Sequence, residues 1–206
     1  RPADQYLCYV ILSPVGAYYK GGIAPVKIWI SDHYVRATEG GTGEAKTGGN
    51  YAASLYAARE AAEKGYDQVL WLDAKEKKYV EEVGSMNLCF ICDGKLVTSP
   101  LKGTILDGIT RRSVLELARY NGIEVEERAL SVDDIFAGVE SGRITEAFGT
   151  GTAVVISPVG QFTYKDRTVV VGDGKTTGRV TQELYDTLTD IQYGRMPDPH
   201  GWVDLL

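Results

Sequence analysis

The stretch GGTGEAKTGGNYAASL, residues 40–55, places Lys46 in a glycine-rich loop that leads directly into a helical pattern. A lysine held by such tight backbone can present its amine inside a cleft. Desolvation there lowers the pKa of the amine and makes it a nucleophile toward an aldehyde. Most lysines are solvated surface charges, and the loop taken alone leaves that interpretation open. The flanking glycines are Gly41, Gly43, Gly48 and Gly49.

Helix signals follow this loop and recur along the chain. The run 51–64 is dominated by Ala, Leu, Arg and Glu, with Asn50 as the predicted N-cap and Gly65 as the residue that ends the helix. One later helix opens with a Ser-x-x-Asp capping signal. Further helices are predicted over 113–122, 131–142 and 177–194.

Runs of β-branched and aromatic residues between these helices predict strands. The pair Asp93-Gly94 indicates a tight hairpin between two of them, and FGTGTA indicates a glycine turn between two others. Because strands and helices do not alternate strictly, we expect an α/β fold with a mixed, α+β-like sheet rather than a doubly wound parallel one. The predicted strands lie at 5–12, 26–31, 68–73, 86–94, 95–100 and, on either side of the glycine turn, within 144–160.

Composition limits the classes of function. The chain has 206 residues and a formal net charge of −6, which argues against nucleic acid as a partner because phosphate-binding surfaces usually carry a basic excess. No apolar run approaches the ~20 residues that span a bilayer, so no membrane partner is expected. The three cysteines do not make a disulfide framework, and a reducing cytoplasm is the expected location.

The Cys89-Phe-Ile-Cys92 segment raises the question of a metal or redox site. It lies inside a predicted strand, where positions three apart face opposite sides. No second Cys/His pair accompanies it, since His33 and His200 lie far off in the sequence. Buried structural thiols are the better interpretation, and no metal is predicted.

Three other segments could bind an anion or a ring nitrogen. LDGITRR starts a helix at 108–110, where free N–H groups and the helix dipole favour a phosphate. FGTGTA offers further N–H and hydroxyl donors at 149–152. Glu82, at a strand end in EEVGSMN, could hold a pyridine nitrogen protonated. Taken singly, each glycine segment is more readily a plain turn, and Glu82 an exposed acid.

Taken in chain order, five segments resemble one family. They are similar to the large domain of the branched-chain aminotransferases, which are pyridoxal-phosphate enzymes of fold type IV, and the resemblance extends from about Tyr9 to Trp202. It implies a pseudo-barrel of mixed strands with flanking helices, pyridoxal 5′-phosphate as the cofactor, and a homodimer. The segments are GGTGEAKTGGNYAASL, EEVGSMN, ILDGITRR, EAFGTGTAVVISPVG and LTDIQYG.

The resemblance assigns roles around the cofactor. Lys46 is expected to form the internal Schiff base and to move a proton between the substrate's Cα and the cofactor's C4′. Glu82 is expected to bond the pyridine nitrogen, with Arg36 in a position that supports Glu82 from behind. Tyr51 is expected to bond the ring's phenolic oxygen. The expected phosphate contacts are the backbone of Ile109 and Thr110, with Thr152. The expected substrate contacts are Ser85, Ala153 and Tyr51.

Two features depart from the family pattern. Asp107 stands where the family usually has proline, so that a negative charge lies near the phosphate. This could weaken cofactor affinity, unless the side chain points to water or caps the helix. Val154 and Ser157 stand where vertebrate members carry a Cys-x-x-Cys switch, so that form of redox regulation is not implied.

The family's N-terminal small domain has little counterpart in this sequence. We expect 1–15 to be the end of that domain, 16–25 an interdomain linker and 26–206 the large cofactor-binding domain. The small domain supplies an arginine to the phosphate and closes over the substrate. Loss of one charged donor removes on the order of 1.5–3 kcal/mol of hydrogen bonding. If these residues act alone, we expect weak or no transamination.

The resemblance implies transfer of the amino group of L-leucine, L-isoleucine or L-valine to 2-oxoglutarate, with amino acids and 2-oxo acids as the partners. EVGSMN and DIQYG favour this group over two other type IV enzymes, a D-amino-acid aminotransferase and an aminodeoxychorismate lyase. An interpretation of a different class also stays open. The chain could be a non-catalytic large-domain fragment that binds cofactor poorly or serves only as a dimerisation module.

Overall fold

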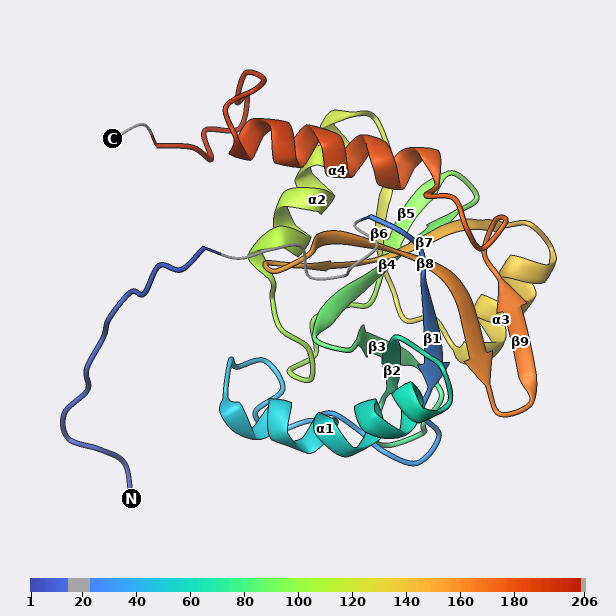
Figure 1. Cartoon of the computed structure of the whole chain (residues 1–206), viewed down its shortest axis with the longest axis horizontal. Helices are drawn as coiled ribbons and strands as arrows, with labels where there is room; N and C mark the ends of the chain where they lie inside the picture. The colour runs from blue at the N-terminus through green and yellow to red at the C-terminus, as the bar shows by residue number, and fades with distance from the viewer. Residues whose placement is uncertain (15–22, 205–206) are drawn as a thin grey trace.

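The computed structural model describes residues 1–14 and 23–204, which contain one mixed sheet flanked by helices (Figure 1). The strands are β1 (Val26–Ile30), β2 (Gln68–Leu72), β3 (Val80–Val83), β4 (Met86–Cys92), β5 (Lys95–Thr98), β6 (Val125–Glu127), β7 (Ile144–Gly151), β8 (Val155–Tyr164) and β9 (Arg167–Val170). The helices are α1 (Gly48–Glu63), α2 (Ile109–Tyr120), α3 (Val132–Glu140) and α4 (Arg179–Gln192). In this described part of the chain, no helix has the length and apolar character needed to cross a membrane.

Six strands of the described residues close on themselves. They pair in the order β3-β2-β1-β8-β7-β4, and β4 also pairs with β3, so that the sheet forms a barrel-like ring. β1 runs parallel to both of its neighbours, whereas the other pairs in the ring are antiparallel. The predicted mixed sheet and pseudo-barrel are therefore confirmed.

Apolar side chains fill the ring and cover its outer faces. The largest buried cluster takes alternate residues of β2 and β4, such as Leu70, Phe90 and Cys92, and lies inside the ring. The residues between them face outward, because side chains alternate along a strand. Trp71 packs with α1, and Cys89 packs with α2 and α4. Figure 1 shows α1 on one side of the sheet and α2 with α4 on the other. The two cysteines therefore face different clusters, as predicted.

Most of the predicted turns and helix ends are confirmed. Asp93 and Gly94 both have positive φ, 51° and 77°, and join β4 to β5 as a two-residue hairpin. Gly65 follows α1 with a φ of 83°. The prediction that Asn50 is the N-cap of α1 is wrong. The helix begins earlier, after Thr47, and Asn50 lies in its first turn.

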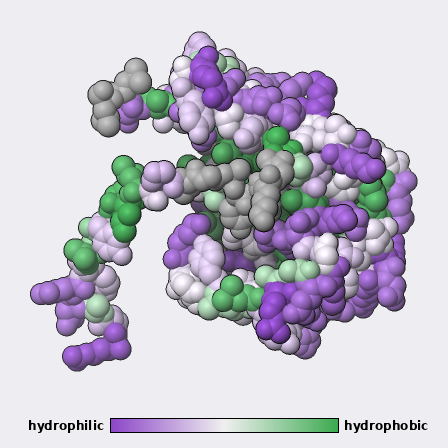
Figure 2. Space-filling model, viewed as in Figure 1, coloured by the Kyte–Doolittle hydropathy of each residue, from purple (hydrophilic) through white to green (hydrophobic). Residues whose placement is uncertain are grey.

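The strand predicted over 5–12 is also wrong. The segment has no strand partner among the described residues and extends away from the rest of the chain (Figure 1). Its apolar side chains are open to solvent, with Tyr6 82% and Leu12 90% exposed (Figure 2). The residue pattern suits a strand, but a strand forms only where neighbouring backbone supplies hydrogen bonds. The linker predicted over 16–25 lies largely outside the described residues.

Helix α3 shows how much one cap contributes. Ser131 Oγ accepts a hydrogen bond from the Asp134 N–H at 3.1 Å, and the Asp134 carboxylate accepts one from the Ser131 N–H at 2.9 Å. Ser131→Ala is expected to lower the free energy of unfolding by about 1 kcal/mol, because α3 loses the acceptor at its first turn. Urea denaturation measures this loss. Ser141→Ala, at the exposed other end of α3, should change the value by less than about 0.5 kcal/mol. Equal losses in the two variants would contradict the capping role.

Candidate active site

Lys46 lies in the loop immediately before α1, and its side chain is exposed. The buried side chain of Asn50 fixes this loop by reaching back from the first turn of the helix. Its Nδ2 donates to the carbonyl oxygens of Thr42 at 2.7 Å and Ala45 at 3.0 Å. Its Oδ1 accepts from Thr42 Oγ1 at 2.7 Å. The side-chain amide of Asn50 therefore holds the lysine loop against α1. The sequence predicted a helix N-cap at this position and not this role.

Gly43 packs the same loop tightly against the segments behind it. A Cβ at this position would lie 2.3 Å from the carbonyl oxygen of Thr104 and 2.7 Å from Ala37 Cβ, so no side chain fits. The Gly43 carbonyl accepts a hydrogen bond from Arg36 Nη2 at 3.2 Å. The same nitrogen also donates to the carbonyl oxygen of Thr104. Arg36 thus joins the lysine loop to the segment that precedes α2.

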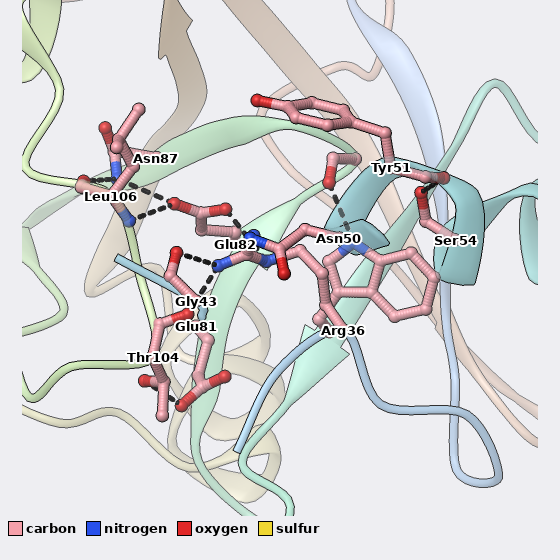
Figure 3. A network of polar contacts seen from close by, with 12 residues as sticks. Arg36, Gly43, Asn50, Tyr51, Ser54, Glu81, Glu82, Asn87, Thr104 and Leu106 are labelled. Carbon is pink, nitrogen blue, oxygen red and sulfur yellow. Dashed lines mark hydrogen bonds and ion pairs between the residues drawn. The ribbon is translucent and has the colours of Figure 1, made fainter. Parts of the chain in front are cut away.

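Glu82 on β3 is a buried acid at the centre of these contacts, only 2% exposed. Its Oε2 lies 3.0 Å from Arg36 Nε, so the two side chains form a buried ion pair. Its Oε1 accepts from Asn87 Nδ2 at 3.1 Å and from the Leu106 N–H at 3.0 Å. Figure 3 shows the carboxylate held between Arg36 on one side and Asn87 with Leu106 on the other. A carboxylate has about four lone-pair sites. Oε1 thus accepts two hydrogen bonds, whereas Oε2 is paired with Arg36 by charge alone, since Arg36 Nε has no hydrogen-bond partner among the described residues. Oε2 therefore has lone pairs free for a further partner.

The electrostatics of Glu82 show what that partner must provide. Burial raises the pKa of Glu82 above its ordinary value, while Arg36, the Leu106 N–H and Lys46 act in the opposite direction. The carboxylate therefore still lacks part of the positive charge that would offset its burial. A protonated ring nitrogen would add both a positive charge and a hydrogen bond to Oε2. The residues present fit a pyridine ring at this position.

The predicted ring-binding residues and two of the predicted substrate-binding residues, Tyr51 and Ser85, open into one small pocket. Glu82, Tyr51 and Ser85 line it together with Arg36. Tyr51 is 40% exposed, and the Lys46 Nζ lies 5.7 Å from the centre of its ring. These side chains come from the loop before α1, from α1 itself, from β3 and from the β3–β4 turn. The fold thus brings separate sequence segments to one opening.

The predicted phosphate-binding turn starts α2. Ile109 and Thr110 are its first residues, after the N-cap Gly108, so the N–H groups of this turn have no acceptor within the helix. Gly108 is needed because a Cβ would lie 2.5 Å from Asn87 Oδ1. Asn87 Nδ2 also donates to the carbonyl oxygen of Leu106 at 2.9 Å. Asn87 therefore fixes the position of this turn relative to Glu82, although no sequence pattern singled it out.

Thr152 and Ala153 lie exposed in the turn between β7 and β8. The register pairs Asn87 on β4 with Thr150 on β7. Because paired antiparallel strands advance in opposite directions, the next residues of β7 run toward the β3–β4 turn that carries Ser85. The β7–β8 turn therefore lies at the same end of the sheet as the pocket. The prediction that the glycines form this turn is wrong, because Gly149 and Gly151 belong to β7 and pair with β8. None of the residues in this turn lines the pocket itself.

Asp107 points toward solvent beside Arg112, with Oδ1 3.5 Å from Arg112 Nε. Both side chains are more than half exposed. Gly108, not Asp107, is the N-cap of α2. The structure thus favours the solvent-facing alternative for Asp107. The effect of this charge on phosphate affinity stays a prediction.

A comparison with protein families shows to which family the chain belongs. The amino-transferase class IV family matches residues 1–162, which is most of the sequence. The chain belongs to this family. Class IV membership agrees with the fold, since the crystal structure of the Escherichia coli branched-chain amino acid aminotransferase superposes with a TM-score of 0.79 at 32% sequence identity. That similarity covers 94% of this chain and 60% of the Escherichia coli chain. The predicted fold of a type IV aminotransferase domain is confirmed.

Two further similar proteins are also described as branched-chain aminotransferases. The chain is 55% identical over 201 residues to the probable branched-chain-amino-acid aminotransferase of Staphylococcus aureus strain N315, which covers 97% of this chain and 56% of the relative. The branched-chain amino acid aminotransferase of T.th., complexed with N-(5′-phosphopyridoxyl)-L-glutamate, has a TM-score of 0.73 at 33% identity, over 87% of this chain and 56% of that one. The chain spans about half the length of the curated relatives it matches.

Proposed function

We propose that the chain is the cofactor-binding domain of a branched-chain-amino-acid aminotransferase that uses pyridoxal 5′-phosphate. The observation that carries this proposal is the buried Glu82 carboxylate. Its Oε1 accepts two hydrogen bonds, its Oε2 pairs with Arg36 and keeps lone pairs free, and the residue lines the same pocket as Tyr51. The Staphylococcus aureus relative supports the activity. The phosphopyridoxyl compound bound to the T.th. enzyme supports the cofactor.

The residues of the site divide the work of holding the cofactor. Pyridoxal phosphate would supply an aldehyde for a lysine and a ring that withdraws electrons from the substrate's Cα. Glu82 would bind the ring nitrogen and keep it protonated, while Arg36 favours the ionised form of Glu82. The Tyr51 hydroxyl would bond the ring's phenolic oxygen. The phosphate would be held at the start of α2 by the residues Ile109 and Thr110, with Thr152 from the β7–β8 turn.

Lys46 would serve both as the covalent attachment point and as the proton carrier. Its amine would hold the cofactor covalently, and the same amine would carry a proton between the substrate's Cα and the cofactor's C4′. Asn50 and Gly43 hold the loop in place, while the flexible stem of the lysine lets the amine reach both atoms. A fixed loop with a flexible side chain suits this double role.

The expected amino donors are L-leucine, L-isoleucine and L-valine, with 2-oxoglutarate as acceptor and with Ser85, Ala153 and Tyr51 at the substrate. With pyridoxal phosphate and 2-oxoglutarate present, L-leucine should be converted to its 2-oxo acid, slowly for the chain alone, and D-alanine should not. Chromatography of the oxo acids measures both. Conversion of D-alanine alone would identify a D-amino-acid aminotransferase, and conversion of neither would favour a non-catalytic domain.

We further propose that 1–15 ends a small domain, that 16–25 links it to the large domain over 26–206, and that the complete protein is a cytoplasmic homodimer. The chain spans about half the length of its curated relatives, which agrees with a further domain in the complete protein. The exposed apolar side chains of 5–12 agree with a segment that packs against such a domain.

Attachment of the cofactor tests the proposal without requiring turnover. The chain mixed with pyridoxal phosphate should develop a visible absorbance band. Lys46→Ala should abolish it because, among the described residues, Lys46 supplies the amine beside Tyr51 and Glu82. Lys64→Ala, at the far end of α1, should leave the band unchanged. A band that persists in Lys46→Ala would assign the attachment to another lysine, and no band in the unaltered chain would favour the non-catalytic alternative.

A further inference from the structure

Successive residues of β3 open onto opposite faces of the sheet. Glu82 faces the pocket described above, whereas its neighbour Glu81 points the other way, toward Thr104 (Figure 3). On that other face lies a second cavity of about 730 Å³. It is formed by four stretches of chain: the loop that follows β1, the β2–β3 loop continuing into β3, the segment after β5, and Ala129 after β6. The roles proposed for the cofactor site leave this cavity without a function.

Glu81 is a buried acid in the wall of this cavity with an incomplete set of partners. Glu81 is 8% exposed. Its Oε1 accepts a hydrogen bond from Thr104 Oγ1 at 2.5 Å. Its Oε2 is buried and has no hydrogen-bond partner among the described residues. Burial raises the pKa of Glu81, and the nearby acids Asp73 and Glu39 act in the same direction. Thr104 and Arg36 oppose the rise. A buried carboxylate oxygen without a partner is costly unless a donor reaches it.

The other charged groups of the cavity define which ligand would suit it. Asp73 is already engaged, because its carboxylate accepts from the backbone N–H groups of Glu76, Lys78 and Tyr79. The remaining charges stand at the exposed opening and balance in number: Glu39 and Glu76 against Lys75 and Lys102. The negative charge that is left belongs to Asp73 and Glu81, and of these two Glu81 has the carboxylate oxygen without a hydrogen-bond partner. Within the described residues no group of three or more His, Cys, Asp and Glu side chains could hold a metal ion.

We propose that this cavity binds a small organic ammonium ion, whose N–H groups donate to Glu81 while its apolar remainder lies along the cavity wall. An ammonium ion supplies both a donor and a positive charge to the unpaired carboxylate oxygen. Val80, Ile105 and Ala129 provide apolar contacts for the remainder. The cavity is large enough for such a ligand, since pockets for small molecules have volumes of about 300–1,000 Å³.

The cavity is also connected to the cofactor site. Thr104 donates its hydroxyl to Glu81, and its carbonyl oxygen accepts from Arg36, which pairs with Glu82. A ligand that draws Glu81 into its ionised form therefore acts on the residue that links both carboxylates. Binding of an amine at Glu81 can therefore affect the Arg36–Glu82 pair through Thr104.

Binding of n-butylammonium to the chain without pyridoxal phosphate tests the inference, because the amine then has no aldehyde to react with. The ¹⁵N-labelled chain should show amide shifts at Glu81, Thr104 and Ala129 on titration with n-butylammonium. Neutral n-butanol should not produce them. Glu81→Gln should weaken the affinity by about tenfold or more, the effect expected from loss of a charged hydrogen bond. Glu76→Gln, at the opening, should change it by less than about twofold. Binding should strengthen as the pH rises, because the ionised carboxylate is the form that binds.

Each contrary result would overturn the inference. Such results are no shifts in the unaltered chain, shifts that map elsewhere, equal binding of n-butanol, or undiminished affinity in a folded Glu81→Gln variant. If Glu81→Gln does not fold, the map of shifts in the unaltered chain decides. Binding that appears only in Lys102→Ala would mean that the chain's own Lys102 occupies the carboxylate. The outcome is independent of the proposed aminotransferase activity, since no cofactor is present.

Discussion

Arg36→Met is expected to lower the free energy of unfolding by about 3–5 kcal/mol, the effect of breaking a buried ion pair from one side. Arg36 and Glu82 have side chains that are only 9% and 3% exposed, so water cannot replace the guanidinium. The variant also loses the hydrogen bonds that Arg36 donates to Gly43 and Thr104. Urea denaturation at neutral pH measures the loss. This is the largest effect that we expect from any single substitution in the site.

The pH dependence of Arg36→Met has a definite sign. Without Arg36, burial raises the pKa of Glu82 in the folded chain further above its value in the unfolded chain. Between those two values the folded state binds more protons, so stability falls as the pH rises. The deficit relative to the unaltered chain should therefore shrink as the pH is lowered toward about 4, the ordinary pKa of a glutamate.

Two controls separate the ion pair from general damage. The double variant Arg36→Met with Glu82→Gln should be more stable than Arg36→Met alone, because no unpaired charge is then buried. Arg59→Ala breaks an Arg–Glu pair on α1 whose side chains are 72% and 64% exposed, and it should cost at most about 1 kcal/mol. A double variant as unstable as the sum of its parts would show that Arg36 acts through packing alone.

Gly43→Ala is expected to lower the free energy of unfolding by about 1–3 kcal/mol and to slow attachment of pyridoxal phosphate to Lys46. The added Cβ would lie 2.3 Å from the Thr104 carbonyl oxygen and 2.7 Å from Ala37 Cβ, so backbone must move. The moving backbone is the loop that carries Lys46. Urea denaturation and the growth of the visible band measure the two effects.

Gly48→Ala is the matched control, because Gly48 lies on the other side of Lys46. Nothing lies within 4 Å of a Cβ placed there, and Gly48 is the first residue of α1. Alanine fits this helical position and has fewer conformations than glycine in the unfolded chain. The free energy of unfolding of this variant should therefore rise by about 0.4–1 kcal/mol. Attachment of the cofactor should be unchanged. If Gly43→Ala matches Gly48→Ala in both measurements, the close packing of the lysine loop is not important.

Local sequence patterns were enough to place most helices and strands. The capping pair Ser131 and Asp134, the hairpin turn at Asp93-Gly94 and the end of α1 at Gly65 each depend on neighbours a few residues apart. The segment 5–12 shows the limit of such patterns, because a strand needs a partner that no local pattern reveals. The short strands β6 and β9 have no counterpart among the predictions, since three or four half-exposed residues give little periodicity.

The candidate site could be predicted only for residues with a distinctive local setting. Lys46 stands out among its glycines and Glu82 in EEVGSMN, and Arg36 was placed by resemblance. Asn50 and Asn87 could not be recognised in this way. Their importance comes from hydrogen bonds to other segments, such as Asn87 to Leu106. The cavity beside Glu81 escaped for the same reason, because four separate segments form it.

The position of β1 between β2 and β8 has a consequence for how the chain folds during synthesis. β1 can pair with β2 soon after both leave the ribosome, but its other edge must wait for β8. At typical rates of translation that interval is on the order of ten seconds. Throughout it, an apolar strand with unpaired N–H and C=O groups is open to neighbouring nascent chains. We therefore expect nascent chains on one polysome to depend on chaperones until Tyr164, the last residue of β8, has left the ribosome.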